Sequence, residues 1–245
     1  MSVAEVNQEL LAGQPVTVLE SGPANNTFLL CSGIKILLME TANCQLDRDL
    51  TNPNLKPIMC AQFNHNGSVL IHAGLDGTIG MTDMHRGELL CFWTVHSSPI
   101  TAIGLTSDQT GYKLPPFFQS NVYDISHFSL WSLAEDNVMA FSNIVTLNDK
   151  TWEGQLPFSE DRSSLVSRKT FKLSSDGKFF LTNSNGGSFI YKLPCVTSTV
   201  VKFQKILELR SEEEVTSVSW SPGECGPVLS GDCHGNINIY TLLSQ

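Results

Sequence analysis

Residues 58–84, IMCAQFNHNGSVLIHAGLDGTIGMTDM, decide the fold of this chain. The stretch contains three short apolar segments, separated by turns at 64–67 and 75–77. Asn-Gly and Asp-Gly pairs favour hairpins, because both tolerate the positive φ that a tight turn between twisted strands requires. Three antiparallel strands cannot bury their faces alone. The stretch therefore predicts a β-sheet unit that recurs along the chain.

The same order of turns and strands returns further along. Aligned on their turns, three copies read FNHNGSVLIHAGLDGTIGMTD (63–83), FKLSSDGKFFLTNSNGGSFIYK (171–192) and WSPGECGPVLSGDCHGNINIYT (220–241). Looser copies lie at 15–41 and 100–133. Five copies in 245 residues give a spacing near the roughly 40–45 residues of a WD40 repeat. The repeat is the main structural signal, and no long helical period competes with it.

Composition narrows the class of protein. The net charge is −9, from 24 acidic and 15 basic residues, which argues against nucleic-acid binding and against unaided binding to an anionic membrane. No apolar run approaches the roughly 20 residues of a membrane span, and the first residues lack the pattern of a secretory signal. The seven cysteines are odd in number and form no CxxC pair, which fits a reduced, cytoplasmic compartment.

The copies resemble degenerate WD40 repeats, the four-stranded blades of a β-propeller. Asp76 stands where such repeats carry an Asp before their third strand, and Asp83 stands at the Asp of the closing Trp-Asp dipeptide. His96 matches the histidine of the repeat, and Trp131 matches the dipeptide Trp of the next copy. The resemblance implies that these four residues are structural.

The repeats predict an all-β chain with five recognisable WD40-type blades. We expect an N-terminal extension at 1–14, either a short helix or a loosely held terminus. The repeat domain then covers 15–245. Its blades are expected at approximately 15–43, 57–95, 97–133, 164–194 and 203–243, with an insert at 134–163.

Three segments narrow the resemblance to the WD repeat-containing protein 91 family. They are CAQFNHNGSVLIHAGLDGTIGMTDM (60–84), SDGKFFLTNSNGGSFIYKL (175–193) and GNINIYTLL (235–243). The resemblance implies part of a seven-bladed propeller. It also implies an effector of a Rab small GTPase that restrains the class III phosphatidylinositol 3-kinase complex during early-to-late endosome conversion. Such a protein is cytoplasmic and reaches early and late endosome membranes through its partners. The alternative is a generic WD40 adaptor of another protein complex.

The chain contains no motif of an enzyme or a cofactor site. GxSxG, P-loop and HExxH patterns are absent from the sequence, so we expect neither catalytic residues nor a cofactor. Cys225, Cys233 and His234 lie close in sequence, but their spacing matches no zinc pattern and a fourth ligand is missing. We expect no metal. The sequence indicates a non-enzymatic scaffold.

Candidate partner-binding residues lie in the segments that interrupt the repeat. TGYKLPPFFQSN (110–121) carries Tyr112, Phe117 and Phe118, and exposed aromatic side chains are frequent hot spots of protein interfaces. The alternative is that the two phenylalanines tuck under the propeller as a degraded strand. Trp152 is a further candidate, and its alternative is a loop residue that packs on the side of a blade.

Overall fold

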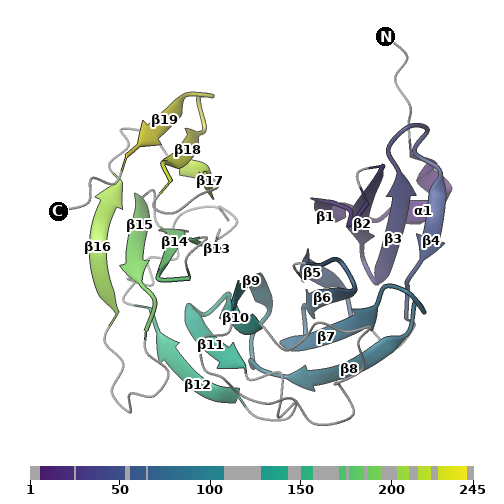
Figure 1. Cartoon of the computed structure of the whole chain (residues 1–245), viewed down its shortest axis with the longest axis horizontal. Helices are drawn as coiled ribbons and strands as arrows, with labels where there is room; N and C mark the ends of the chain where they lie inside the picture. The colour runs from purple at the N-terminus through teal and green to yellow at the C-terminus, as the bar shows by residue number, and fades with distance from the viewer. Residues whose placement is uncertain are drawn as a thin grey trace.

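The computed structural model shows an all-β architecture, with one short helix among the residues that it describes. These residues are 6–24, 26–52, 56–64, 66–107, 128–142, 150–156, 171–174, 177–184, 187–194, 203–209, 215–221 and 226–241. Their strands form five antiparallel sheets, arranged as blades along an open arc (Figure 1). The predicted all-β, WD40-type propeller with five blades is therefore confirmed. No helix within these ranges is long and apolar enough to span a membrane.

Each sheet is one blade, and its strands run from the inside of the arc to the outside (Figure 1). Blade 1 contains β1 (Val16–Ser21), β2 (Thr27–Ser32), β3 (Lys35–Glu40) and β4 (Leu46–Asp49). Blade 2 contains β5 (Ile58–Phe63), β6 (Val69–Gly74), β7 (Thr78–Asp83) and β8 (Leu89–Thr94). Blade 3 contains β9 (Ile100–Ser107), β10 (Phe128–Ala134), β11 (Val138–Ser142) and β12 (Lys150–Gln155). Blade 4 contains β13 (Phe171–Leu173), β14 (Phe179–Ser184), β15 (Gly187–Lys192) and β16 (Gln204–Leu209). Blade 5 contains β17 (Val215–Trp220), β18 (Val228–Asp232) and β19 (Ile237–Tyr240).

The hairpin turns of blade 2 form where the sequence predicts them. The Gly67 N–H donates to the Asn64 carbonyl at 3.0 Å, and Gly67 has a φ of 71°. Gly77, at a φ of 77°, closes the second turn, and a Cβ there would stand 2.0 Å from the His96 carbonyl oxygen. Only glycine combines this backbone conformation with such a close approach.

Successive blades pack face to face. We call the face that a blade turns toward the next blade its forward face, and the opposite one its backward face. The forward face of blade 1 supplies Leu29, Cys31, Ile36 and Leu38 to a cluster that Ile58 and Leu70 of blade 2 complete. Blade 3 does the same with Trp131, Leu133, Met139 and Phe141 against Phe171 and Phe180 of blade 4. Blade 4 supplies Leu181 and Ile190, which pack against Val215, Val218 and Val228 of blade 5. Apolar burial between neighbouring sheets therefore holds the arc together.

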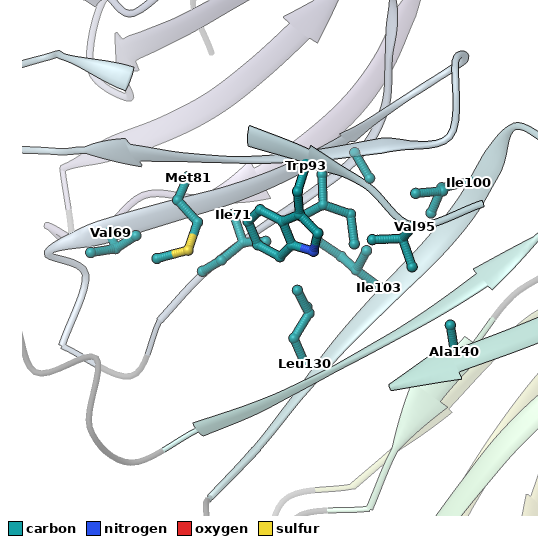
Figure 2. Close-up of a cluster of buried hydrophobic side chains, with 11 residues drawn as sticks. Val69, Ile71, Met81, Trp93, Val95, Ile100, Ile103, Leu130 and Ala140 are labelled. Carbon is teal, nitrogen blue, oxygen red and sulfur yellow. The ribbon is translucent and has the colours of Figure 1, made fainter. Parts of the chain in front are cut away.

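The interface of blades 2 and 3 shows this packing in detail (Figure 2). Trp93 of β8 lies 6% exposed among Ile71 and Met81 of its own blade and Leu130 and Ile103 of blade 3. The indole ring stands at the centre of the cluster in Figure 2, between side chains from both sheets. The outer strand of blade 2 thus contributes directly to the contact with the next blade.

The N-terminal extension forms a helix, α1 (Gln8–Leu11). Its N-cap residue Asn7 accepts the N–H of Glu9 at 2.9 Å, and Ala12 ends it in the left-handed conformation. Leu10 and Leu11 pack on the backward face of blade 1. Of the two alternatives for residues 1–14, the described part, 6–14, shows the short helix.

Three predicted blade boundaries are wrong, and each misplaces the outer strand of a blade, together with the third strand β11 in blade 3. The segment 134–163, predicted as an insert, holds β11 and β12 of blade 3. Blade 1 was predicted to end at 43, but its outer strand β4 lies beyond that residue. The predicted blade 5, 203–243, included β16, which pairs in the sheet of blade 4. These outer strands read LDRD, KTWEGQ and QKILEL, and charged residues obscure their alternation.

The assignment of Trp131 to the Trp-Asp dipeptide position is also wrong. That position ends the third strand of a blade, whereas Trp131 lies in β10, the second strand of blade 3. In register, Trp131 opposes Phe141 of β11, as Ile71 opposes Met81 in blade 2. The twenty residues 108–127, which stand in sequence between β9 and β10, displaced the alignment.

Two adjacent residues of β8 offer a matched test of blade packing. Trp93→Ala removes the ring at the centre of the interface between blades 2 and 3, so we expect it to lower the free energy of unfolding by about 3–5 kcal/mol. Phe92→Ala, at a side chain 65% exposed, is the control and changes it by less than about 0.5 kcal/mol. Urea denaturation measures both. Equal losses for the two variants would contradict this packing.

Candidate interaction surface

The two aspartates of blade 2 that match positions of the WD40 repeat, Asp76 and Asp83, stabilise turns. Asp76 Oδ1 accepts the N–H of Thr78 at 3.1 Å and its hydroxyl at 2.6 Å. Asp83 is fully buried, and its Oδ1 accepts the N–H of His85 at 2.7 Å and that of Arg86 at 3.3 Å. A carboxylate that accepts such local N–H groups fixes a tight turn, as a helix cap does. Both carboxylates are therefore engaged within blade 2.

His96 ties blade 2 to blade 3. It lies 4% exposed, and its Nε2 stands 2.8 Å from the Ser132 hydroxyl of β10. Its backbone N–H donates to the Gly77 carbonyl at 3.1 Å. The histidine thus connects the β6–β7 turn to the second strand of the next blade, which is a structural task.

His72 of β6 is a buried histidine to which the sequence analysis assigns no role. Its Nε2 lies 3.1 Å from the Thr82 hydroxyl, and burial lowers the pKa of the ring from 6.5 to about 4. The ring occupies the space over Gly80, its cross-strand partner, where a Cβ would come within 2.3 Å of it. A glycine inside the alternating run of β7 was the signal that a large side chain lies opposite.

The described structure does not test the predicted partner-binding residues. Tyr112, Phe117 and Phe118 lie outside the described residues. Trp152 belongs to β12, where its backbone pairs with Phe141, and its side chain lies outside the description. Whether these residues bind a partner stays a prediction.

Metal binding finds no support in the part of the chain that the structure describes. Within it, no three His, Cys, Asp or Glu side chains are grouped to hold a metal ion. Cys233 Sγ lies 3.3 Å from Nδ1 of its neighbour His234, and Asp232 Oδ1 accepts the His234 N–H at 3.0 Å. Cys225 falls outside the described residues. The contacts of this turn are those of a β-hairpin, because Asp232 also accepts the Asn236 N–H at 2.9 Å.

The outer strand of blade 2 differs in chemistry from the other outer strands that the structure describes. β4, β12 and β16 each carry acidic and basic residues, whereas β8 reads LLCFWT and carries none. Charges on an edge strand discourage pairing with another chain, and an uncharged edge permits it. Among the fourth strands of blades 1 to 4, which lie on the outside of the arc (Figure 1), β8 is therefore the one that carries no charge.

Phe92 is the exposed side chain of this edge. It is 65% exposed and stands in register with Gly80, while its neighbours Cys91 and Trp93 are partly or fully buried. An aromatic side chain beside an open strand edge suits strand addition, in which main-chain hydrogen bonds hold the partner and a side chain anchors it. Phe92 was not among the residues predicted to bind a partner. The uncharged, largely apolar run of residues 89–94 was a signal that could have found it.

The chain is similar in sequence to proteins from several vertebrates that share one name. WD repeat-containing protein 91 of Xenopus tropicalis is 28% identical over 219 residues, which cover 86% of this chain and 27% of the relative. The protein of the same name from Danio rerio is 28% identical over 236 residues, which cover 93% of this chain and 30% of the relative. The one from Mus musculus is 26% identical over 226 residues, which cover 86% of this chain and 27% of the relative. No family model matches the chain.

The resemblance to the WD repeat-containing protein 91 family is therefore confirmed. The chain spans less than a third of the length of these relatives. Similarity over nearly the whole chain, together with the propeller fold, supports an interaction scaffold of the WD40 type.

The buried His72 predicts how stability depends on pH. The unfolded chain binds a proton near pH 6.5, and the folded chain binds it only near pH 4, so protonation favours unfolding. The contribution of His72 is fully present above pH 6.5 and is lost as the pH falls toward 4, by roughly 1.4 kcal/mol per pH unit.

Urea denaturation between these pH values tests this expectation. We expect a shallower pH dependence in His72→Gln than in the unsubstituted chain. Identical slopes for His72→Gln and the unsubstituted chain would show that His72 titrates equally in both states.

Proposed function

We propose that this chain is a non-enzymatic scaffold that regulates early-to-late endosome conversion. In this proposal it binds a late-endosomal Rab small GTPase in its GTP-bound form and restrains the class III phosphatidylinositol 3-kinase complex. The similarity to WD repeat-containing protein 91 over 86% or more of the chain supports the proposal. The chain reaches the cytoplasmic side of early and late endosomes through these partners.

One structural observation favours a protein-binding role, namely the uncharged outer strand β8 with Phe92 exposed beside it. An uncharged strand edge with an aromatic side chain beside it suits a protein partner that pairs with it by strand addition. The net charge of −9 disfavours direct contact with anionic lipids, which agrees with recruitment through a protein. We therefore assign the Rab contact to the edge of β8.

Binding of the purified chain to the Rab protein, loaded with GTP or with GDP, tests this function. We expect measurable binding to the GTP form and at least about tenfold weaker binding to the GDP form. Phe92→Ala weakens binding to the GTP form by about tenfold or more, because it removes the aromatic anchor. Isothermal titration calorimetry measures each dissociation constant.

Leu75→Ala is the matched control, because Leu75 is also an exposed apolar residue of blade 2, 48% exposed, but lies in a turn away from the outer strand. It leaves the affinity unchanged. Equal affinity for the GTP and GDP forms, or no binding to either, would refute the Rab assignment. Binding to another defined complex in its place would support the generic WD40 adaptor.

A further inference from the structure

Two turns of neighbouring blades carry exposed apolar residues on the same surface of the arc. Ile34 lies in the β2–β3 turn of blade 1 and is 38% exposed, and Leu75 lies in the β6–β7 turn of blade 2 and is 48% exposed. Both turns join the second strand of a blade to its third, so they lie at corresponding ends of the strands. We call the surface that these turns form the turn surface. Packing between blades covers the faces of the sheets rather than these turns.

The segment that connects the two blades holds their turns side by side. The Ile58 N–H donates to the Gly33 carbonyl at 2.8 Å, and the Leu75 N–H donates to the Pro57 carbonyl at 2.9 Å. Residues 56–58 therefore pass between the two turns and are bonded to both. The exposed apolar residues of the turns border this segment on either side, on a backbone that hydrogen bonds fix.

Blade 3 shows that the fold does not require an apolar residue at such a turn. Glu135 follows β10 as Leu75 follows β6, and its N–H makes the equivalent bond to the Pro99 carbonyl, at 2.8 Å. The bond involves only the backbone, so the turn accepts either side chain. Exposed turns are usually built from Gly, Pro, Asn, Asp and Ser. The Leu75 side chain is therefore available to a partner.

Two lysines place positive charge beside the apolar residues. Lys35 follows Ile34, and Lys56 precedes Pro57 in the connecting segment. Neither lysine forms an ion pair within the parts of the chain that the structure describes. An ammonium group beside an apolar contact attracts a carboxylate more strongly once a partner excludes water. We call these residues the turn patch: Ile34, Lys35, Lys56 and Leu75.

The turn surface becomes acidic toward blade 3. Asp76 follows Leu75, and Asp136 stands in the β10–β11 turn, where its Oδ1 accepts the Val138 N–H at 3.0 Å. The lysines of the turn patch lie toward blade 1, so the charge of the surface changes sign along the arc. An acidic group of a partner is therefore attracted to the blade 1 side and repelled from the blade 3 side.

We propose that the turn patch binds an acidic, apolar segment of a protein partner. The apolar side chains of the segment pack on Ile34 and Leu75, and its carboxylates pair with Lys35 and Lys56. Charge complementarity specifies the acidic residues, and the exposed apolar pair specifies the rest. The turn patch is separate from the edge of β8, so a partner can occupy either site without the other.

Selection from a phage-displayed library of random twelve-residue peptides tests this proposal. We expect the unsubstituted chain to enrich peptides that carry Asp or Glu beside Leu, Ile or Phe. A fluorescein-labelled copy of the most enriched peptide serves as the probe in fluorescence anisotropy. Its dissociation constant should rise at least about threefold when the ionic strength increases from about 0.05 to 0.5 M, because salt screens the lysine–carboxylate attraction.

Substitutions in the turn patch identify the site of the peptide. Leu75→Glu installs the residue type that blade 3 carries at this turn, so it preserves the fold and weakens peptide binding by about tenfold or more. Lys35→Gln with Lys56→Gln also weakens binding and removes most of its salt dependence. Leu46→Glu, at a residue of β4 that is 39% exposed, is the control and leaves peptide binding unchanged. Circular dichroism and the melting temperature verify that each variant is folded.

Rab binding separates this site from the edge of β8. Leu75→Glu weakens peptide binding and leaves the affinity for the Rab protein unchanged, so either proposal can fail while the other holds. The turn patch is refuted if the library yields no enriched peptide, or if the enriched peptides carry Lys or Arg in place of Asp and Glu. It is also refuted if the folded Leu75→Glu variant binds the peptide as tightly as the unsubstituted chain.

Discussion

A four-stranded sheet with two apolar faces must be covered on both sides, and the rest of this structure depends on that constraint. Each described blade buries apolar residues against its neighbour, and a sheet with apolar faces is not stable alone. Packing each forward face on the next backward face buries residues such as Ile36, Ile79 and Phe180 completely. The arc follows from repetition of this single contact, because each repeat contacts only its neighbours.

Polar side chains set the geometry of this packing rather than a chemical site. Asp76 and Asp83 fix turns inside blade 2, and His96 links a turn of blade 2 to Ser132 of blade 3. Among the described residues, these recognisable polar positions are engaged in contacts that hold turns and neighbouring blades. An interaction scaffold is the function that such a distribution of side chains supports.

Local signals predicted the parts of the fold that depend on turns and alternation. The turns at 64–67 and 75–77, and the blade built on them, follow from Asn-Gly and Asp-Gly chemistry between apolar strands. Outer strands such as β4 were not predictable, because solvent faces one side of them and their charges mask the alternation. Trp131 was misassigned because an aromatic residue near a strand end resembles the repeat motif. Whether its strand is the second or the third of the blade depends on which strands it pairs with, and local sequence does not specify that. The packing of α1 on blade 1 and the exposure of Phe92 depend on contacts far apart in sequence, which local pattern does not specify.

Hydrogen exchange of the native chain, resolved by peptide, tests most directly the claim that face-to-face packing holds the arc together. We expect β6, β7 and β10, which lie between neighbouring blades, to exchange slowly and together, through one cooperative opening. We expect β19, with Ile237 and Ile239 exposed, to exchange much faster in the monomeric chain. Protection of β19 equal to that of β7 in the monomer, or independent opening of blades 2 and 3, would contradict it.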